Sequence, residues 1–229
     1  RFVSRNAAPR DVTYLELARR TNRFANVLRT LGVGRGDHVF VLAGRVPEFY
    51  TAVLGALKNG SVVIPCSSGL GMESVRARLA ASEAGVLLTT EALYRTGVDE
   101  IASELRHLTH MLVAGENGTH TQLPGTVDLA TRMERAVDTF DAVRTAADDV
   151  ALLQFAGNEA TLKAAIHVHG AAIAHYASGK YALDLHDHDV VWCTVDTATA
   201  AGLSYGILAP LLHGVRCIVD EAAFDKCKK

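Results

Sequence analysis

Residues 38–65 read HVFVLAGRVPEFYTAVLGALKNGSVVIP and divide into three segments of distinct pattern. The outer segments, at 38–42 and 61–65, are short apolar runs rich in valine, as buried strands are. Between them, Pro47 falls in a helical first turn, Asn59 and Gly60 end the segment, and the large apolar side chains recur at helical spacing. This strand–helix–strand order predicts an α/β fold with a mostly parallel sheet and flanking helices.

The same alternation continues on both sides of this unit. Thr13 and Glu16 form a predicted capping box at the start of a helix that ends near Gly32. Because the short runs are apolar on both faces, they are typical of strands covered by helices on both sides. We expect parallel strands at 38–42, 61–65, 85–89, 110–114 and 190–195. A helix is predicted at 98–108. The second half is predicted to contain strands 151–155, 164–168 and 215–219, and helices 170–183 and 203–213.

Composition excludes several classes of protein. The chain has 229 residues, 49% of them hydrophobic, and a formal net charge of -2. That balance gives no electrostatic basis for binding nucleic acid or an anionic membrane. No apolar run approaches the roughly 18 residues that a membrane-spanning helix needs. The four cysteines form no CxxC pair, so we predict a reducing, cytoplasmic location.

Residues 151–170, ALLQFAGNEATLKAAIHVHG, contain a polar loop that ends in a lysine. Gly157 and Lys163 have the glycine-to-lysine spacing of a Walker A loop. However, Leu162 replaces the second glycine, Ala164 replaces the serine or threonine, and a strand is predicted to follow in place of a helix. This loop is therefore not a Walker A phosphate site.

Several stretches occur in the order and spacing of one known family. ALLQF, LKAAIHVHG, HYASGKYALDLHDHDVVWCTVD and GLSYGILAPLLHG, together with the stretch from Val12 to Pro65, resemble the AMP-forming acyl-CoA synthetases, most of all the acetyl-CoA synthetases. The resemblance covers nearly the whole chain. It implies an enzyme that uses ATP, Mg and coenzyme A to activate acetate or another short acid. The acid would first become an acyl-adenylate, with release of pyrophosphate.

The resemblance implies a phosphate-binding role for the polar loop. The family's loop is close to T-S-G-T-T-G-x-P-K, and here the corresponding residues are AGNEATLK. Lys163 takes the place of the family's lysine, Gly157 survives, and Thr161 stands in for one hydroxyl. Glu159 adds a negative charge where a triphosphate would lie. We predict that any remaining nucleotide binding is weak.

The acyl-pocket segment is also altered. The family's acetate-specific members read close to D-P-G-W-V-T-G-x-S-Y-G, and here the sequence is DTATAAGLSYG. Asp196 and Gly202 match that pattern. Thr199 replaces the tryptophan, and Ala200 and Ala201 replace the valine and threonine, so the pocket wall becomes smaller.

Arg95 falls where the resemblance places an arginine on the 3′-phosphate of coenzyme A. The fork of an arginine suits phosphate, although a solvated loop arginine would look the same. The histidines near 167–169 and 186–188 are explained more simply by a strand end and a polar turn than by zinc. We predict no catalytic residue and no metal site within these residues.

The family's later segments do not occur in these 229 residues. They include the Y-G-x-T-E-like stretch and the domain with the catalytic lysine. We therefore expect residues 1–229 to be a partial N-terminal domain, with a subdivision near 141–149 and no C-terminal domain. We expect the chain to be inactive by itself and to expose an apolar face or cover it by self-association. A non-enzymatic interaction or regulatory module, or a small enzyme of different chemistry on the same fold, are the alternatives.

Overall fold

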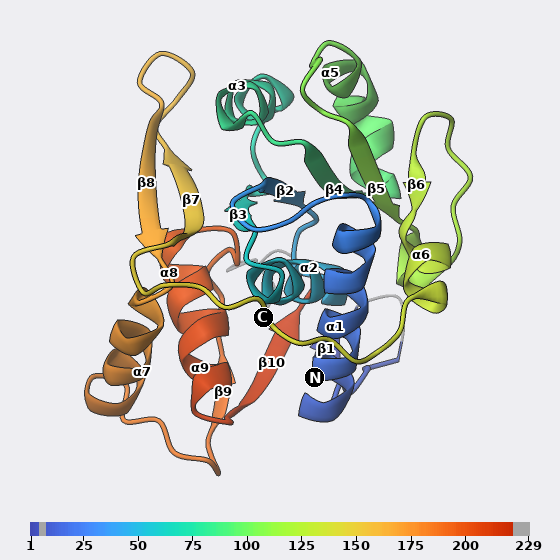
Figure 1. Cartoon of the computed structure of the whole chain (residues 1–229). Helices are drawn as coiled ribbons and strands as arrows, with labels where there is room; N and C mark the ends of the chain where they lie inside the picture. Colours follow the sequence, from blue (N-terminus) through green and yellow to red (C-terminus); the bar gives the residue numbers. More distant parts are fainter. Residues whose placement is uncertain (5–7, 222–229) are drawn as a thin grey trace, which may run out of the picture.

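A long, mostly parallel sheet forms the centre of the computed structural model, which describes residues 1–4 and 8–221 (Figure 1). Within that part of the chain, seven strands form the sheet in the order β6-β5-β4-β2-β3-β7-β8. All neighbouring pairs are parallel except β7 and β8, which form an antiparallel hairpin. The strands are β2 (His38–Leu42), β3 (Val62–Pro65), β4 (Val86–Thr90), β5 (His110–Ala114), β6 (Val127–Asp128), β7 (Val150–Ala156) and β8 (Lys163–Val168).

A second, smaller sheet joins the two ends of the described chain. It has the order β1-β10-β9, with β1 (Phe2–Val3), β10 (Arg216–Asp220) and β9 (Val190–Trp192), and both pairings are parallel. The strand predicted at 190–195 therefore ends at Trp192 and belongs to this second sheet. The sequence does not distinguish one sheet from two, because the alternation of strands and helices does not specify which strands are neighbours.

Helices cover both faces of the long sheet, as the apolar strands predicted. Val39 and Val41 of β2 pack into a core with α1 (Tyr14–Thr30) and α2 (Pro47–Lys58). Phe40 and Leu42 face the opposite way, into a core with α3 (Met72–Ser82) and α5 (Asp99–Ser103). Since successive strand residues alternate between faces, a strand buried on both sides must be apolar throughout.

The start of α1 confirms half of the predicted capping box. The Thr13 hydroxyl accepts a hydrogen bond of 3.1 Å from the backbone N–H of Glu16. The Glu16 carboxylate instead pairs with Arg20, one turn further along the helix. The cap satisfies one of the backbone donors that a helix start leaves without an internal partner.

Two helical segments differ from their predicted bounds. The predicted helix 98–108 corresponds to α5, which begins within a residue of its predicted start but ends at Ser103, five residues early. It is preceded by α4 (Glu91–Leu93) and a π-helical turn η1 (Tyr94–Val98), in which Gly97 has a φ of 118°. The predicted helix 203–213 begins earlier, as α8 (Ala200–Leu203), a π-helical turn η3 (Ser204–Leu208) and α9 (Ala209–Leu212). Pro210 has no backbone N–H to donate, which favours such an irregular turn before it.

The remaining elements lie outside the central layers. Helix α7 (Ala171–Tyr181) follows β8 and lies at the lower left of Figure 1, beside α9. Helix α6 (Leu129–Arg135) packs near β5, and the loop between β5 and β6 contains a short 3₁₀ turn η2 (Glu116–Gly118). In residues 1–4 and 8–221, no helix combines the length and apolar character needed to cross a bilayer. Cys227 lies outside the described residues.

The segment between α6 and β7 has no helix or strand but is held by hydrogen bonds. Asn26 Nδ2 donates to the carbonyls of Val137 and Thr139, at 2.9 Å each. The Val143 N–H donates to the Lys58 carbonyl at 2.8 Å. These bonds hold the segment against α1 and α2. They also give hydrogen-bond partners to backbone groups that have none within a helix or strand.

Candidate functional site

The polar loop between β7 and β8 is closed by hydrogen bonds within itself. The Asn158 side-chain oxygen accepts from the backbone N–H groups of Ala160 (3.1 Å) and Thr161 (3.0 Å). It also accepts from the Thr161 hydroxyl at 2.8 Å. A loop that cradles phosphate directs its N–H and hydroxyl groups at the ligand. Here Asn158 occupies those groups, so Thr161 does not present its hydroxyl outward.

Gly157 is required by the conformation of this loop. Its φ of +94° lies in the left-handed region that favours glycine. A side chain added there would also come within 2.4 Å of the Thr161 carbonyl oxygen. The glycine that the sequence marked as a phosphate-loop residue is thus explained by the turn itself.

Helix α3 holds the loop from one side. The buried Arg78 guanidinium donates to the Gly157 carbonyl at 2.5 Å and to the Ser74 carbonyl at 2.9 Å. The Ser74 hydroxyl donates to the Glu159 carboxylate. This hydrogen bond, with a smaller effect of Arg78, lowers the pKa of Glu159 below its ordinary value. Glu159 is therefore charged at neutral pH and is held beside the loop.

Lys163 is the one predicted phosphate ligand whose side chain has no competing partner among the described residues. It begins β8 opposite Ala156 and is exposed. The loop projects beyond the neighbouring elements at the upper left of Figure 1. The lysine can therefore attract an anion, but no described residue encloses that anion.

Asp196 and Gly202 lie together after β9. The Ser67 hydroxyl, in the loop after β3, donates to Asp196 Oδ2 at 2.6 Å. A side chain at Gly202 would come within 1.9 Å of the Asp196 carbonyl oxygen, so only glycine fits this approach. Thr199 caps α8 by accepting from the Gly202 N–H at 3.1 Å. The residue that replaces the family's tryptophan thus acts here as a helix cap.

The segment that the sequence predicts to line an acyl pocket has small, exposed side chains at two positions. Ala200 and Ala201 are both exposed in the first turn of α8. Behind them, the Gln154 amide of β7 donates to the Ala198 carbonyl at 3.4 Å. This hydrogen bond places residues 196–202 next to the strand that precedes the polar loop.

A crevice of about 770 Å³ lies where the parallel strands end. It is lined by residues at or just after the ends of β2, β4 and β5, among them Gly44, Thr90 and Gly115. The chain runs from β2 to β3 on one side and then crosses back to β4 on the other side of β2, which makes this a topological switch point. Ligands of open α/β sheets bind outside the carboxyl ends of strands at such points. Of the predicted site residues, Asp196 alone lines this crevice.

Arg45 and Glu48 line the same crevice and were missed by the sequence reasoning. Arg45 donates to the Thr194 carbonyl at 2.5 Å, and burial raises the pKa of Glu48. The sequence did contain a signal for these two residues: each is charged and lies after the end of a predicted strand, in or before the first turn of the helix that follows it. That position points toward the ligand edge of a parallel sheet.

Arg95 is separate from the polar loop. It lies in η1, and its Nε and one terminal nitrogen bond Glu91 Oε1 at 3.1 and 2.6 Å. This pairing lowers the pKa of Glu91. Most of the Arg95 side chain is exposed. To bind a coenzyme phosphate, the guanidinium would exchange Glu91 for that phosphate.

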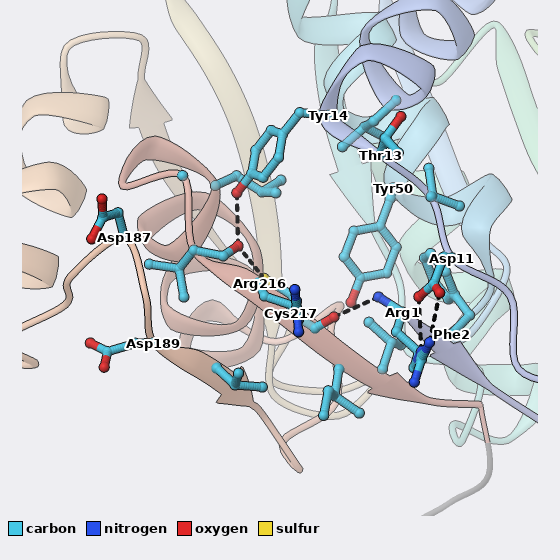
Figure 2. Close-up of a pocket in the computed structure, with 18 of the residues that line it drawn as sticks. Arg1, Phe2, Asp11, Thr13, Tyr14, Tyr50, Asp187, Asp189, Arg216 and Cys217 are labelled. Carbon is cyan, nitrogen blue, oxygen red and sulfur yellow. Dashed lines mark hydrogen bonds and ion pairs between the residues drawn. The ribbon is translucent and has the colours of Figure 1, made fainter.

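A larger cavity of about 810 Å³ lies between the start of α1 and β10 (Figure 2). The Tyr14 hydroxyl donates across it to the Val215 carbonyl at 2.8 Å, and Arg1 pairs with Asp11 at its edge. Burial raises the pKa of Tyr14 to about 12. None of the site residues predicted from the sequence lines this cavity. Among the described residues, no group of three or more metal-ligating side chains is arranged to hold a metal ion.

The mostly parallel sheet, with helices on both faces and a crevice at the carboxyl ends of its strands, defines the class of open α/β folds that bind ligands at that edge. A sequence model of the AMP-binding enzyme family matches residues 2–228, and the chain belongs to that family. It is 38% identical to the acetyl-coenzyme A synthetase of Bacillus subtilis, over 93% of this chain and 37% of that protein. It is 29% identical to the human mitochondrial acyl-coenzyme A synthetase ACSM3, over 93% of this chain and 36% of that protein.

Solved structures agree on the fold. A Brucella canis acyl-CoA synthetase superimposes with a TM-score of 0.87 at 24% identity, over 97% of this chain and 40% of that chain. An anthranilate CoA ligase in complex with anthranoyl-AMP gives a TM-score of 0.87 at 20% identity, over 97% of this chain and 42% of that chain. The chain thus spans little more than a third of the length of the curated relatives and has the fold of the acyl-CoA ligases.

Proposed function

We propose that these residues form the first part of the large N-terminal domain of an AMP-forming acyl-CoA synthetase, most similar to acetyl-CoA synthetase. The complete enzyme would join acetate or another short acid to the α-phosphate of ATP and release pyrophosphate. The thiol of coenzyme A would then take the acyl group and release AMP. The match to the AMP-binding family over residues 2–228 is the observation that carries this proposal. The subdivision near 141–149 and the cytoplasmic location remain predictions.

We further propose that the 229 residues by themselves do not form an acyl-adenylate. Adenylation needs donors aimed at the negative charge that develops on the phosphate. Asn158 occupies the loop N–H groups of Ala160 and Thr161, and Glu159 is a charged carboxylate beside them. Lys163 is one cation without a second donor. This set of groups fits a triphosphate with its Mg²⁺ poorly, so no step of a reaction is assigned to it.

Binding of MgATP, measured by calorimetry, tests the proposed state of the loop. We expect weak binding in the parent protein, tighter binding in Glu159→Thr because the opposing charge is removed, and none in Lys163→Ala. Glu134→Thr is the matched control, since it removes the same charge from α6, at the other end of the sheet. A micromolar dissociation constant in the parent, unchanged by Glu159→Thr, would contradict the proposal.

The second candidate is a non-enzymatic interaction module on the synthetase scaffold. The observation that favours it is the distribution of exposed apolar side chains, which gather in the second half of the chain. A surface of that kind binds another protein surface more readily than a small acid. Self-association through that surface would be one way to cover it.

A further inference from the structure

The loop between β5 and β6 forms part of the crevice wall through a tight turn. Gly115 and Asn117 are among the residues that line the crevice at the carboxyl ends of the parallel strands. The Gly118 N–H donates to the Gly115 carbonyl at 3.2 Å. A Cβ on Gly115 would come within 2.2 Å of the Thr119 carbonyl oxygen, so the two ends of the turn are in close contact. Residues 115–119 therefore form one compact unit.

His120 follows this turn directly and joins it to α6. Its Nδ1 lies 2.9 Å from Asp128 Oδ2, at the end of β6, and its Nε2 lies 3.3 Å from Glu134 Oε1, within α6. Both ring nitrogens therefore face a carboxylate. Among the described residues, these two carboxylates are the charged groups that act on the ring.

The donors and acceptors around the His120 ring fit its protonated form. An ionised carboxylate accepts hydrogen bonds and donates none, whereas a neutral imidazole has one N–H and an imidazolium has two. The Thr131 hydroxyl lies 3.2 Å from Nδ1, but its proton is donated to Asp128 Oδ2. Nδ1 must therefore donate to Asp128, which leaves Nε2 of a neutral ring with a lone pair that faces Glu134. Only the imidazolium donates to both carboxylates.

The two carboxylates differ in their freedom to move. The Asp128 side chain is 14% exposed and also accepts from the N–H groups of Thr121 and Thr131. The Glu134 side chain is 66% exposed, so it can turn into solvent. When His120 loses a proton, its bond to Asp128 can stay, and its contact with Glu134 is the one that breaks.

We propose that His120 is a proton-dependent clamp on one wall of the crevice. The protonated ring bridges Asp128 and Glu134 and fixes the turn at 115–119 against α6. Loss of the proton releases Glu134 and leaves the turn held by fewer contacts. Protonation of one histidine thus sets how firmly this wall of the crevice is held.

The clamp closes as pH falls. The hydrogen bond to Asp128, followed by the charge of Glu134, raises the pKa of His120 above its ordinary value of about 6.5. A folded-state pKa above the unfolded value contributes stability that is fully present below about pH 6.5 and is lost as pH rises through the folded-state value. The Thr126 hydroxyl, which donates to the Leu123 carbonyl at 2.8 Å within the same loop, does not titrate, so that contact stays.

A pH titration of the His120 ring nitrogens, followed by NMR, tests the clamp directly. The parent is expected to keep both ring N–H groups to a higher pH than an unperturbed histidine. Glu134→Gln is expected to lower the midpoint, because glutamine carries no charge to favour the imidazolium. Glu100→Gln is the matched control, since it removes an exposed carboxylate from α5, on the other face of the sheet. In that variant His120 should titrate as in the parent.

Hydrogen exchange of the turn gives a second readout. Protection factors for residues 115–121, corrected for the intrinsic effect of pH on exchange, should be about two- to fivefold higher at about pH 6 than at about pH 8, because an exposed ion pair contributes modestly. In Glu134→Gln this difference should be lost, and in Glu100→Gln it should be kept.

Two results would overturn the proposal. One is protection of the turn that does not change with pH in the parent, and the other is a His120 midpoint that Glu134→Gln leaves unchanged. Neither experiment uses ATP or an acid substrate, so failure here leaves the proposed function untouched.

Discussion

The Arg78 guanidinium donates a 2.5 Å hydrogen bond to the backbone carbonyl of Gly157, which joins the middle of α3 to the first residue of the polar loop. Arg78 is 6% exposed, so this cation lies within the protein and is satisfied by carbonyl oxygens. A buried charge is tolerated only when hydrogen bonds replace its water. The loop that resembles a phosphate site is therefore also a structural contact between β7 and α3.

Replacing Arg78 with alanine should destabilise the fold. The variant loses the bonds to Gly157 and Ser74 and leaves both carbonyls without that donor, which costs about 1–3 kcal/mol of unfolding free energy. Arg76→Ala is the control on the same helix, since Arg76 makes an exposed ion pair with Glu104 at 2.7 Å. Exposed pairs contribute at most about 1 kcal/mol. Equal losses in the two variants, measured by urea unfolding, would argue against the structural role of Arg78.

Asp128 should contribute to stability as the cap of α6. Its carboxylate accepts from the N–H groups of Thr121 and Thr131, at 3.2 and 3.1 Å. Asp128→Ala should cost about 1–2 kcal/mol of unfolding free energy at pH 7. Asp128→Asn keeps a good cap and should cost less. A loss for asparagine as large as that for alanine would show that charge, and not capping, is what matters.

The same carboxyl predicts an acid transition. Burial opposes its ionisation, but hydrogen bonds from Thr131 and His120 dominate, and the pKa of Asp128 is about 2. A folded-state pKa below the unfolded value adds stability that is complete above about pH 4 and is lost as pH falls toward 2. Urea unfolding at several acid pH values gives the unfolding free energy as a function of pH. That free energy should fall less steeply with decreasing pH in Asp128→Asn than in the parent. Identical slopes would contradict the assignment.

Gly202 should tolerate no side chain. In Gly202→Ala the new Cβ would meet the Asp196 carbonyl oxygen at 1.9 Å, and crowding of a packed site costs about 1–3 kcal/mol or more. Gly34→Ala is the control, because its Cβ would have a 4.0 Å contact with Asp37 and the φ of Gly34 is not left-handed. Thermal melting compares the two. Equal melting temperatures for the two variants would contradict the close contact between Gly202 and the Asp196 carbonyl.

Local pattern was enough to predict much of the fold. The parallel strands β2, β3, β4 and β5 begin and end within a residue of their predicted positions, because apolar runs bounded by glycine or proline are local signals. The start of α1 at Thr13 was equally local. The sequence did not show that β9 belongs to a second sheet, because neighbour order depends on contacts between distant residues.

The candidate site was less predictable for the same reason. Gly157, Lys163 and Asp196 were found by their resemblance to family patterns, and they do lie near the carboxyl ends of strands. The bond between Arg78 and Gly157 joins residues that are 79 positions apart, and no sequence period reports such a pair. The Asn158 bonds that close the loop depend on its exact backbone conformation, which composition does not determine.

Release of pyrophosphate from MgATP tests the central claim most directly. The reaction would be followed with acetate, propionate and longer acids, with and without coenzyme A, in the parent protein and in Lys163→Ala. Losing one preorganised donor typically lowers a rate by about 10²–10³, and the loop here keeps Lys163 without the other donors. We predict no release above background in either protein. Turnover in the parent that Lys163→Ala abolishes would contradict this account and show that the loop is a working phosphate site.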